Sequence, residues 1–385
     1  MTDDQMKKPK ENYEYNPKRR KLAKIYFKQK IIMMLGNHFV IPVVATILLF
    51  LLGYFKHLSE FSTSFAGGFW GILLFVFLIS ITSQLIEFPL SFYGSYIYEH
   101  KYKLSKYTLK GWFVDYGKEF LLGIIIGLPV AFITAYWLTT TPLWWLYVTL
   151  LMVAFNIFID YIYSITILPF MYKLYPYADK AELKKILEIC KKCGANNIHN
   201  VKVIKESEKS VKPNAFFVGF GRNKIICLYD TLLNQLTKRE IRTVIGHEVG
   251  HYVKRHVFKH LALSAIETLG ILFVANTVIR SSFEITGAGI PLELVPIISV
   301  TTTIIGFMIM PIAMSYSRKH EFEADTFALD HVKDPLAQIS SEKRLDDLAL
   351  GDNKPHPLVE FWMLSHPCGS KRIKNVEAWM AKNKH

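Results

Sequence analysis

Cysteine is scarce in this chain: 385 residues contain only four, Cys190, Cys193, Cys227 and Cys368. Cys190 and Cys193 form a lone CxxC pair, but a zinc knuckle would need two further ligands at similar spacing, and the sequence has none nearby. All four fall in segments that the charge pattern described below assigns to the cytosol, where disulfides are rare. We therefore interpret Cys190 and Cys193 as two thiols on an amphipathic helix.

Acidic residues are fewer than basic ones, 32 against 46, which gives a formal net charge of +14. No recognised nucleic-acid-binding motif accompanies this excess, so we expect no nucleic acid as a partner. The charge instead favours the basic cytoplasmic loops of a membrane protein. A cleavable signal peptide is not expected either, because the first thirty residues are polar and the first apolar run is long enough to span a membrane.

Apolar residues are abundant, at 51% of the chain, and the mean hydropathy is +0.21. Such values are typical of polytopic membrane proteins. Six apolar stretches reach the length of about 20 residues that a hydrocarbon core requires: Ile31–Phe55, Ala66–Leu90, Phe120–Leu138, Leu143–Ile167, Phe258–Ile279 and Pro291–Met314. They predict an all-α polytopic membrane protein with about six transmembrane helices.

The distribution of Lys and Arg predicts the orientation of these spans. Residues 1–30 carry ten basic side chains and the loop after the second span carries five lysines, whereas the three loops on the opposite side hold only Lys56 and Arg280. We therefore expect both termini, residues 168–257 and residues 315–385 in the cytosol.

The pentad "HEVGH" predicts a hydrolytic metal site. His247 and His251 are four residues apart, which on a helix is about 40° of rotation and 6 Å of rise, so both imidazoles reach one ion. Glu248 would then act as general base on a metal-activated water. Thr237 and Glu240 form a capping box that predicts the start of this helix.

A catalytic zinc needs a third protein ligand, and the sequence after His251 lacks the His-x-x-Gly-x-x-His extension of metzincins. The best candidate is Glu321 in "SRKHEFEADTFALD", with Asp325 on the same helical face as acceptor for a ligand imidazole. Glu323 would point about 200° away. The fifth and sixth spans form a hairpin that returns Glu321 to the side of His251.

The HEVGH helix is expected to continue into the membrane as one helix, with the metal about 9 Å along its axis from Phe258. His256 would lie about 140° around that helix from His251 and could not share its metal without a break. His260 is interpreted as an interfacial residue.

These residues resemble the zinc-dependent type I CAAX prenyl endopeptidases, integral membrane proteases that cleave prenylated C-termini. The blocks that carry the resemblance are "KPNAFFVGFGRNKIICLYDTLL", "LTKREIRTVIGHEVGHYVKRH", "SRKHEFEADTFAL" and "DNKPHPLVEFWMLSHPCGSKRI". The resemblance implies one Zn²⁺ per chain, held by His247, His251 and Glu321, with Glu248 as catalytic base. Asp325 would support a ligand histidine.

The resemblance also implies further site residues. His366 and Arg372 match an element that assists substrate or oxyanion binding, and Asn214, Ala215 and Phe216 match the start of a substrate-binding edge strand. From the residues alone, "NAFFVGF" and "KIICLYD" read as a hairpin turning at Arg222–Asn223. Its edge could add an extended peptide as a strand, although plain core strands fit the same pattern.

Members of this family enclose an intramembrane chamber, which would account for Glu87, Asp160 and Glu267. They usually have seven spans, whereas six are counted here, with the usual first one missing. The expected architecture is therefore about six transmembrane helices enclosing a chamber, with a small cytosolic gluzincin-like α+β metalloprotease element.

We expect a basic cytosolic N-terminal segment (1–30), a four-span membrane region (31–167), a cytosolic catalytic region with the edge strand and the HEVGH helix (168–257), a transmembrane hairpin (258–314) and a cytosolic C-terminal region with the third ligand (315–385). The expected partners are a peptide or protein substrate, prenylated if the resemblance extends to it, and membrane lipid. The protein is expected to be a monomer, in the endoplasmic reticulum membrane if eukaryotic and the inner membrane if bacterial.

Two alternatives stay open at this point. A heat-shock-type membrane protease that degrades misfolded membrane proteins would use the same chemistry, but such enzymes are shorter and have fewer spans. A non-catalytic transporter or receptor with a structural metal would require a fourth protein ligand and would not depend on Glu248.

Overall fold

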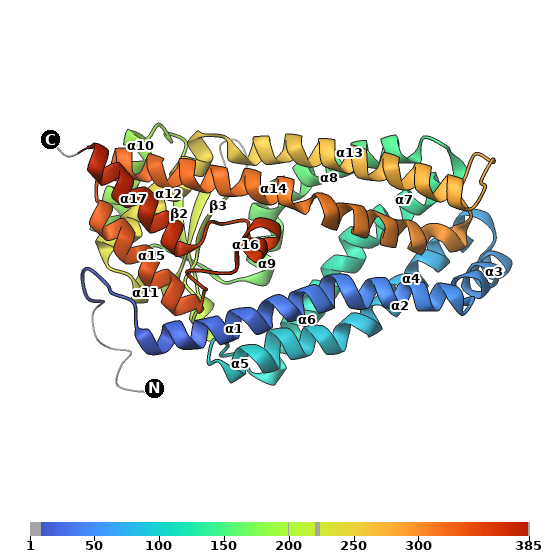
Figure 1. Cartoon of the computed structure of the whole chain (residues 1–385), viewed down its shortest axis with the longest axis horizontal. Helices are drawn as coiled ribbons and strands as arrows, with labels where there is room; N and C mark the ends of the chain where they lie inside the picture. The colour runs from blue at the N-terminus through green and yellow to red at the C-terminus, as the bar shows by residue number, and fades with distance from the viewer. Residues whose placement is uncertain (1–8, 199, 220–223, 384–385) are drawn as a thin grey trace.

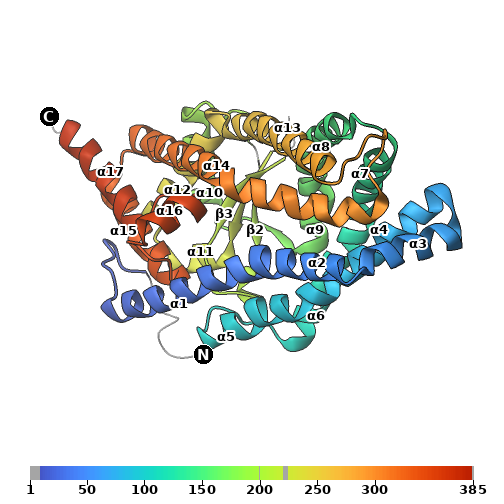
Figure 2. The ribbon, with the colours of Figure 1, turned by 45° about the vertical axis from the view of Figure 1, so that its right-hand side comes forward.

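The computed structural model describes residues 9–198, 200–219 and 224–383. The molecule is elongated and mostly helical, with one small sheet (Figure 1). The sheet and both ends of the described chain lie at one end of the long axis. The helix α3 (Tyr54–Ala66) and the loop between α13 and α14 lie at the other end, and a second view agrees (Figure 2).

Six helices in the described part of the chain are long and apolar enough to cross a membrane. Their segments are α1 (Pro17–Leu35) with α2 (Ile41–Leu51), α4 (Gly68–Ser91) with α5 (Glu99–Lys101), α6 (Leu109–Leu122) with α7 (Leu128–Thr140), α8 (Trp144–Ile162) with α9 (Leu168–Met171), α13 (His256–Ser282) and α14 (Val295–Val332). Short π-helical turns at Gly36–Val40, Phe92–Tyr98, Gly123–Gly127 and Tyr163–Ile167 join the paired segments. The six predicted spans are confirmed.

A four-stranded sheet forms the centre of the extramembrane part, with β1 (Leu174–Pro176), β2 (Asn200–Ile204), β4 (Ile225–Tyr229) and β3 (Ala215–Val218) in that order. β2 and β4 are parallel, while β3 pairs antiparallel with β4 and forms an edge. The predicted hairpin and edge strand are therefore confirmed. The predicted turn at Arg222–Asn223 lies outside the described residues.

Three helices pack on this sheet: α10 (Lys180–Lys192), α11 (Asp230–Gln235) and α12 (Lys238–Val253). Ile186 on α10, Ile226 on β4 and Ile245 on α12 are fully buried in their shared core. Cys190 and Cys193 lie in the same core as free thiols, as the interpretation of an amphipathic helix requires. This core fixes one face of α12 against the sheet.

The HEVGH helix does not continue into the membrane, so this prediction is wrong. α12 ends at Val253, and α13 begins at His256 after Arg255, which adopts the left-handed conformation at φ 57°. A left-handed non-glycine residue costs about 1–2 kcal/mol. Tertiary contacts must therefore outweigh the preference for a straight helix at Arg255.

The helix that runs unbroken from a membrane span to the predicted site residues is the sixth span, not the HEVGH helix. α14 runs 38 residues without interruption and carries Glu321 and Asp325 near its end. The expected domain boundary between residues 314 and 315 therefore falls inside one helix. Beyond α14 the chain forms α15 (Pro335–Ala349) and α17 (Gly369–Lys382) at the end of the molecule that holds the sheet, while α16 (Pro357–Met363) lies nearer the middle, beside α14 (Figure 1).

Two glycines on α12 permit its close packing on α14. A Cβ on Gly250 would lie 3.1 Å from the Cα of Ala324, and a Cβ on Gly246 would lie 2.6 Å from a methyl of Val332. Any larger side chain would separate the two helices. The glycines thus set how near Glu321 and Asp325 come to the histidines of α12.

The chamber expected among the membrane spans stays a prediction. Glu87 lines a hollow of about 510 Å³ that also includes Lys30, Asn37 and His38 of the first span. One carboxylate oxygen of Glu267 is buried with no hydrogen-bond partner in the described part of the molecule.

Candidate metal centre

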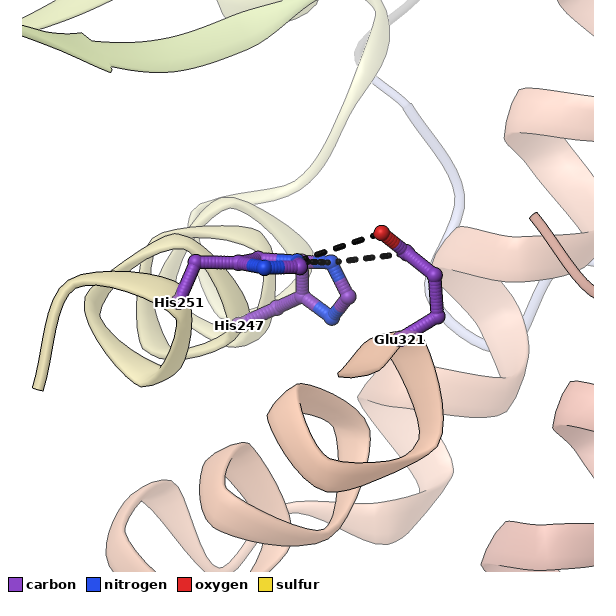
Figure 3. Close-up of side chains that lie close together, drawn as sticks. All are labelled: His247, His251 and Glu321. Atoms are coloured by element: carbon purple, nitrogen blue, oxygen red, sulfur yellow. Dashed lines mark hydrogen bonds and ion pairs between the residues drawn. The ribbon is translucent and has the colours of Figure 1, made fainter. Parts of the chain in front are cut away.

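Two histidines of α12 and a glutamate of α14 converge on one point. Nε2 of His247 and Nε2 of His251 lie 3.1 Å apart. Each of these nitrogens is 3.3 Å from a carboxylate oxygen of Glu321. Figure 3 shows the carboxylate of Glu321 pointing across from its own helix toward both rings. The structure therefore brings together the three residues for which the sequence predicts metal ligation.

The donor set fits a zinc ion. Around a tetrahedral zinc with bonds of about 2.0–2.1 Å, neighbouring ligand atoms are separated by roughly 3.3–3.4 Å, close to the separations found here. Oε2 of Glu321 is buried and makes no hydrogen bond within the described residues, although His247 Nε2 lies 3.3 Å from it. A bound cation would satisfy this oxygen.

The electrostatics of the site also favour a cation. Burial alone would lower the pKa of His247, but the carboxylates of Asp325 and Glu321 outweigh burial and raise that pKa to about 10. A cluster that stabilises a positive charge on its histidine so strongly would stabilise a metal cation for the same reason.

A network behind His247 holds its ring in place. Nδ1 of His247 lies 2.8 Å from Oδ1 of Asp325, and Nε of Arg372 donates to Oδ2 of the same carboxylate at 2.8 Å. Arg372 also pairs with Glu342 at 2.9 Å. Burial alone would lower the pKa of the Arg372 guanidinium, but Asp325 and Glu342 outweigh it and hold that pKa well above its usual range.

Glu248 lies beside this cluster, but its carboxylate is not engaged in the network of contacts. Its side chain is half-buried, and its carboxylate makes no hydrogen bond or ion pair with any described residue. Burial raises the pKa of Glu248, and the neighbouring imidazoles of His247 and His251 partly offset that rise. An unengaged carboxylate with a raised pKa is suited to exchange protons with a water molecule.

The other candidate residues lie at the margin of the cluster. Nε2 of His366 is 3.4 Å from Oε1 of Glu321, and its side chain is 64% exposed, so it lies over the open side. Arg372 is only 14% exposed and faces Asp325 and Glu342. Of these two side chains, His366 is therefore the more exposed.

The strand β3 lies beside α12, because the ring of Phe217 stacks on Tyr252 with centroids 6.2 Å apart. Asn214 is exposed just before the strand, and its side-chain oxygen accepts a hydrogen bond from the amide of Ala215. Ala215 is buried and Phe216 half-buried. The structure thus places this trio along the edge strand but records no contact between it and the three clustered ligands.

Sequence reasoning missed several residues of this centre. Gly246 and Gly250 were detectable, because small residues four apart are a known signal of close helix packing. The sequence around Glu342 carries no comparable signal, because its ion pair with Arg372 depends on how α15 packs. His256 and Glu323 could not be assigned to the site from the sequence, because a straight helix keeps His256 away from His251 and Glu323 points away from Glu321 on its own helix.

Six apolar helices and a helix-borne His/Glu cluster define the class: a multi-pass membrane metalloprotease. The chain belongs to peptidase family M48, which it matches over residues 178–380, and residues 6–173 match the CAAX prenyl protease N-terminal region of five membrane helices. This bears out the resemblance found in the sequence.

The names of individual relatives agree with this family assignment. An uncharacterized metalloprotease, YhfN of Bacillus subtilis, is 30% identical over 316 residues, covering 79% of this chain and 72% of its own. CAAX prenyl protease 1 of Saccharomyces cerevisiae is 29% identical over 337 residues, covering 81% and 73%. The crystal structure of S. mikatae Ste24p has the same fold, with a TM-score of 0.79 at 22% identity over 94% of this chain and 89% of that one.

Proposed function

We propose that this metalloprotease is a zinc endopeptidase that cleaves peptide bonds near the C-terminus of prenylated CAAX proteins. The observation that carries the metal assignment is the convergence of two imidazole nitrogens, 3.1 Å apart, with the two carboxylate oxygens of Glu321, each 3.3 Å from one of those nitrogens. The substrate class is supported by the relatives named CAAX prenyl protease and by the match to the N-terminal region of such proteases.

His247, His251 and Glu321 would hold one zinc per chain, which supplies Lewis acidity and a water of lowered pKa when bound. Glu248 takes a proton from the attacking water and returns it to the amine of the leaving group. The unengaged carboxylate of Glu248 leaves it free for both transfers. Asp325 keeps His247 in the tautomer that presents Nε2 to the metal.

The substrate would lie along the edge of β3, where Asn214, Ala215 and Phe216 begin a strand whose outer side no described strand covers. His366 would contact the substrate or its developing oxyanion from the open side of the cluster. Arg372 acts as a positioning residue through Asp325, because its guanidinium is committed to two carboxylates. The centre would lie on the cytosolic side of the membrane, in a monomer.

The test is cleavage of a farnesylated and an unfarnesylated CAAX peptide by the full chain in lipid nanodiscs. Glu248→Gln should reduce turnover by roughly 10²–10⁴-fold while the metal stays bound. Glu377→Gln, an exposed glutamate on α17, is the matched control and should change nothing.

Persistent cleavage by Glu248→Gln would contradict the mechanism. Equal rates on the two peptides would contradict prenyl specificity and favour a protease that degrades misfolded membrane proteins. Loss of activity with a chelator, and its return with Zn²⁺, is expected for either substrate class.

A further inference from the structure

The second nitrogen of His251 has a partner that the proposed mechanism does not use. Nδ1 of His251 lies 2.9 Å from Nδ1 of His256, and Nε2 of His256 lies 3.2 Å from Oε2 of Glu323. His256 is buried, with 2% of its surface exposed. A chain of contacts therefore runs from the ligand cluster through two imidazoles to a carboxylate.

The tautomers along this chain follow from the direction of His251. A neutral imidazole carries one proton, and Nε2 of His251 points to the ligand cluster, so its proton is on Nδ1. Nδ1 of His256 must then accept that proton's hydrogen bond, which puts the proton of His256 on Nε2. That proton faces Oε2 of Glu323, an acceptor. Every donor in the chain thus meets an acceptor.

We propose that His256 and Glu323 form a positioning relay that fixes the ring of His251, just as Asp325 alone fixes the ring of His247. The inference rests on the proposed role of His251 as a metal ligand. Both ligand histidines would then have their outer nitrogen fixed, one directly by a carboxylate and the other by a carboxylate acting through an imidazole. Such partners orient the ligand ring and raise its basicity.

The relay explains the break between α12 and α13. In a straight helix His256 would lie about 140° around the axis from His251. The left-handed Arg255 ends that helix and turns the chain, so that His256 lies against His251 instead. Its conformational cost of about 1–2 kcal/mol is consistent with a conformation retained for this contact.

His256, His320 and Glu323 could also be taken for a second metal site, since their ligand atoms lie within 4.8 Å of one another. The rings of His256 and His320 are stacked, with centroids 4.1 Å apart and planes 8° apart. Their lone pairs therefore lie in two separate, nearly parallel planes and cannot both point at one ion. A metal on Nε2 of His256 would also put a proton on Nδ1, directly against the protonated Nδ1 of His251. The geometry favours the relay over a second metal.

The relay predicts how fast the zinc-loaded full chain releases its metal to a chromogenic chelator. His256→Leu removes the acceptor and should accelerate release by roughly 10- to 100-fold. His256→Asn, whose side-chain oxygen can replace Nδ1 as acceptor, should stay within about 3-fold of wild type. His260→Asn is the matched control, because His260 contacts His320 and Tyr316 but not the relay, and it should not change the rate.

An unchanged rate of zinc release from His256→Leu would overturn the relay. The relay would also be overturned if the wild-type chain bound two zinc ions and His256→Leu bound only one. If His256→Leu does not fold, the less buried Glu323→Ala decides: release accelerated by about 3-fold or more supports the relay, and an unchanged rate overturns it. Metal release is measured without substrate. Failure of the relay is therefore distinct from failure of the proposed CAAX activity, which would leave the zinc bound and the peptide uncut.

Discussion

Nδ1 of His247 and Oδ1 of Asp325 lie 2.8 Å apart, although 78 residues separate them in the chain. The pair joins the two helices that make the metal centre, α12 and α14. Arg372 of α17 donates to the same carboxylate, so a third helix is tied to the pair. The position of one ligand ring thus depends on packing between three elements.

Substitution of Asp325 by asparagine should weaken metal binding. The amide oxygen can still accept from His247, but the negative charge that pairs with Arg372 and strengthens the imidazole is lost. We expect metal release to the chelator to accelerate by roughly 10- to 100-fold. Asp330→Asn, an exposed aspartate on the same helix, is the control and should keep the wild-type rate. A wild-type rate for Asp325→Asn would show that the pair does not hold the ligand.

Substitution of Arg372 by lysine separates a positioning role from a substrate-binding role. A lysine cannot reproduce the forked contact with Asp325 and Glu342. If Arg372 acts through Asp325, kcat should fall by roughly 10-fold or more with KM nearly unchanged. A rise in KM with unchanged kcat would instead support the role in substrate binding that the family resemblance implies. Lys374→Met, on an exposed position of the same helix, serves as control.

Local patterns in the sequence account for most of what was predicted correctly. The spans follow from apolar length, the start of α12 follows from its capping box, and the closeness of the His247 and His251 rings follows from helix geometry. Glu321 and Asp325 share one face of α14 for the same reason. Each of these features depends on residues close together in the chain.

Most of the features that sequence reasoning missed depend on contacts between separate elements. The break at Arg255 opposes local helix preference and coincides with a contact between His251 and His256 that only the folded chain makes. The pairing of Arg372 with Glu342 likewise requires α15 and α17 to be in place. No periodicity within one segment encodes such contacts, because the residues that make them come from separate elements.

Substitution of Gly250 by alanine should disturb the packing of α12 on α14. The added Cβ would lie 3.1 Å from the Cα of Ala324 and 3.2 Å from its carbonyl oxygen, so backbone must move. We expect a loss of about 1–3 kcal/mol in unfolding free energy and faster metal release, since Glu321 moves with α14. Thermal unfolding in detergent and the chelator assay measure both.

Gly270→Ala is the control for this change, because nothing lies within 4 Å of the position where its Cβ would be. Alanine is also the better helix former, so this variant should be as stable as wild type or more so. Equal stability of Gly250→Ala and wild type would show that the two helices can separate without loss.

Glu206 makes the stability of the protein depend on pH. Its carboxyl is buried in the short turn that follows β2, with Oε2 lacking a hydrogen-bond partner among the described residues. Burial raises its pKa to about 7; Asp230 and Asp115 add to the rise, and Lys209 and Lys212 partly offset it. Between its ordinary pKa and about 7 the folded state binds more protons than the unfolded state, so stability falls as pH rises through this window.

Substitution of Glu206 by glutamine should therefore flatten the pH dependence and stabilise the protein above pH 7. We expect a gain of about 1–3 kcal/mol at pH 8, seen as a rise of a few degrees in unfolding temperature, and little change at pH 5, where the carboxyl is protonated in the folded state. Unfolding temperatures across pH 5–8 in detergent measure this. Glu208→Gln, on the same turn but exposed and paired with Lys205, is the control and should not produce the gain. A parallel pH profile for Glu206→Gln and wild type would show that Glu206 is ionised in the folded protein throughout.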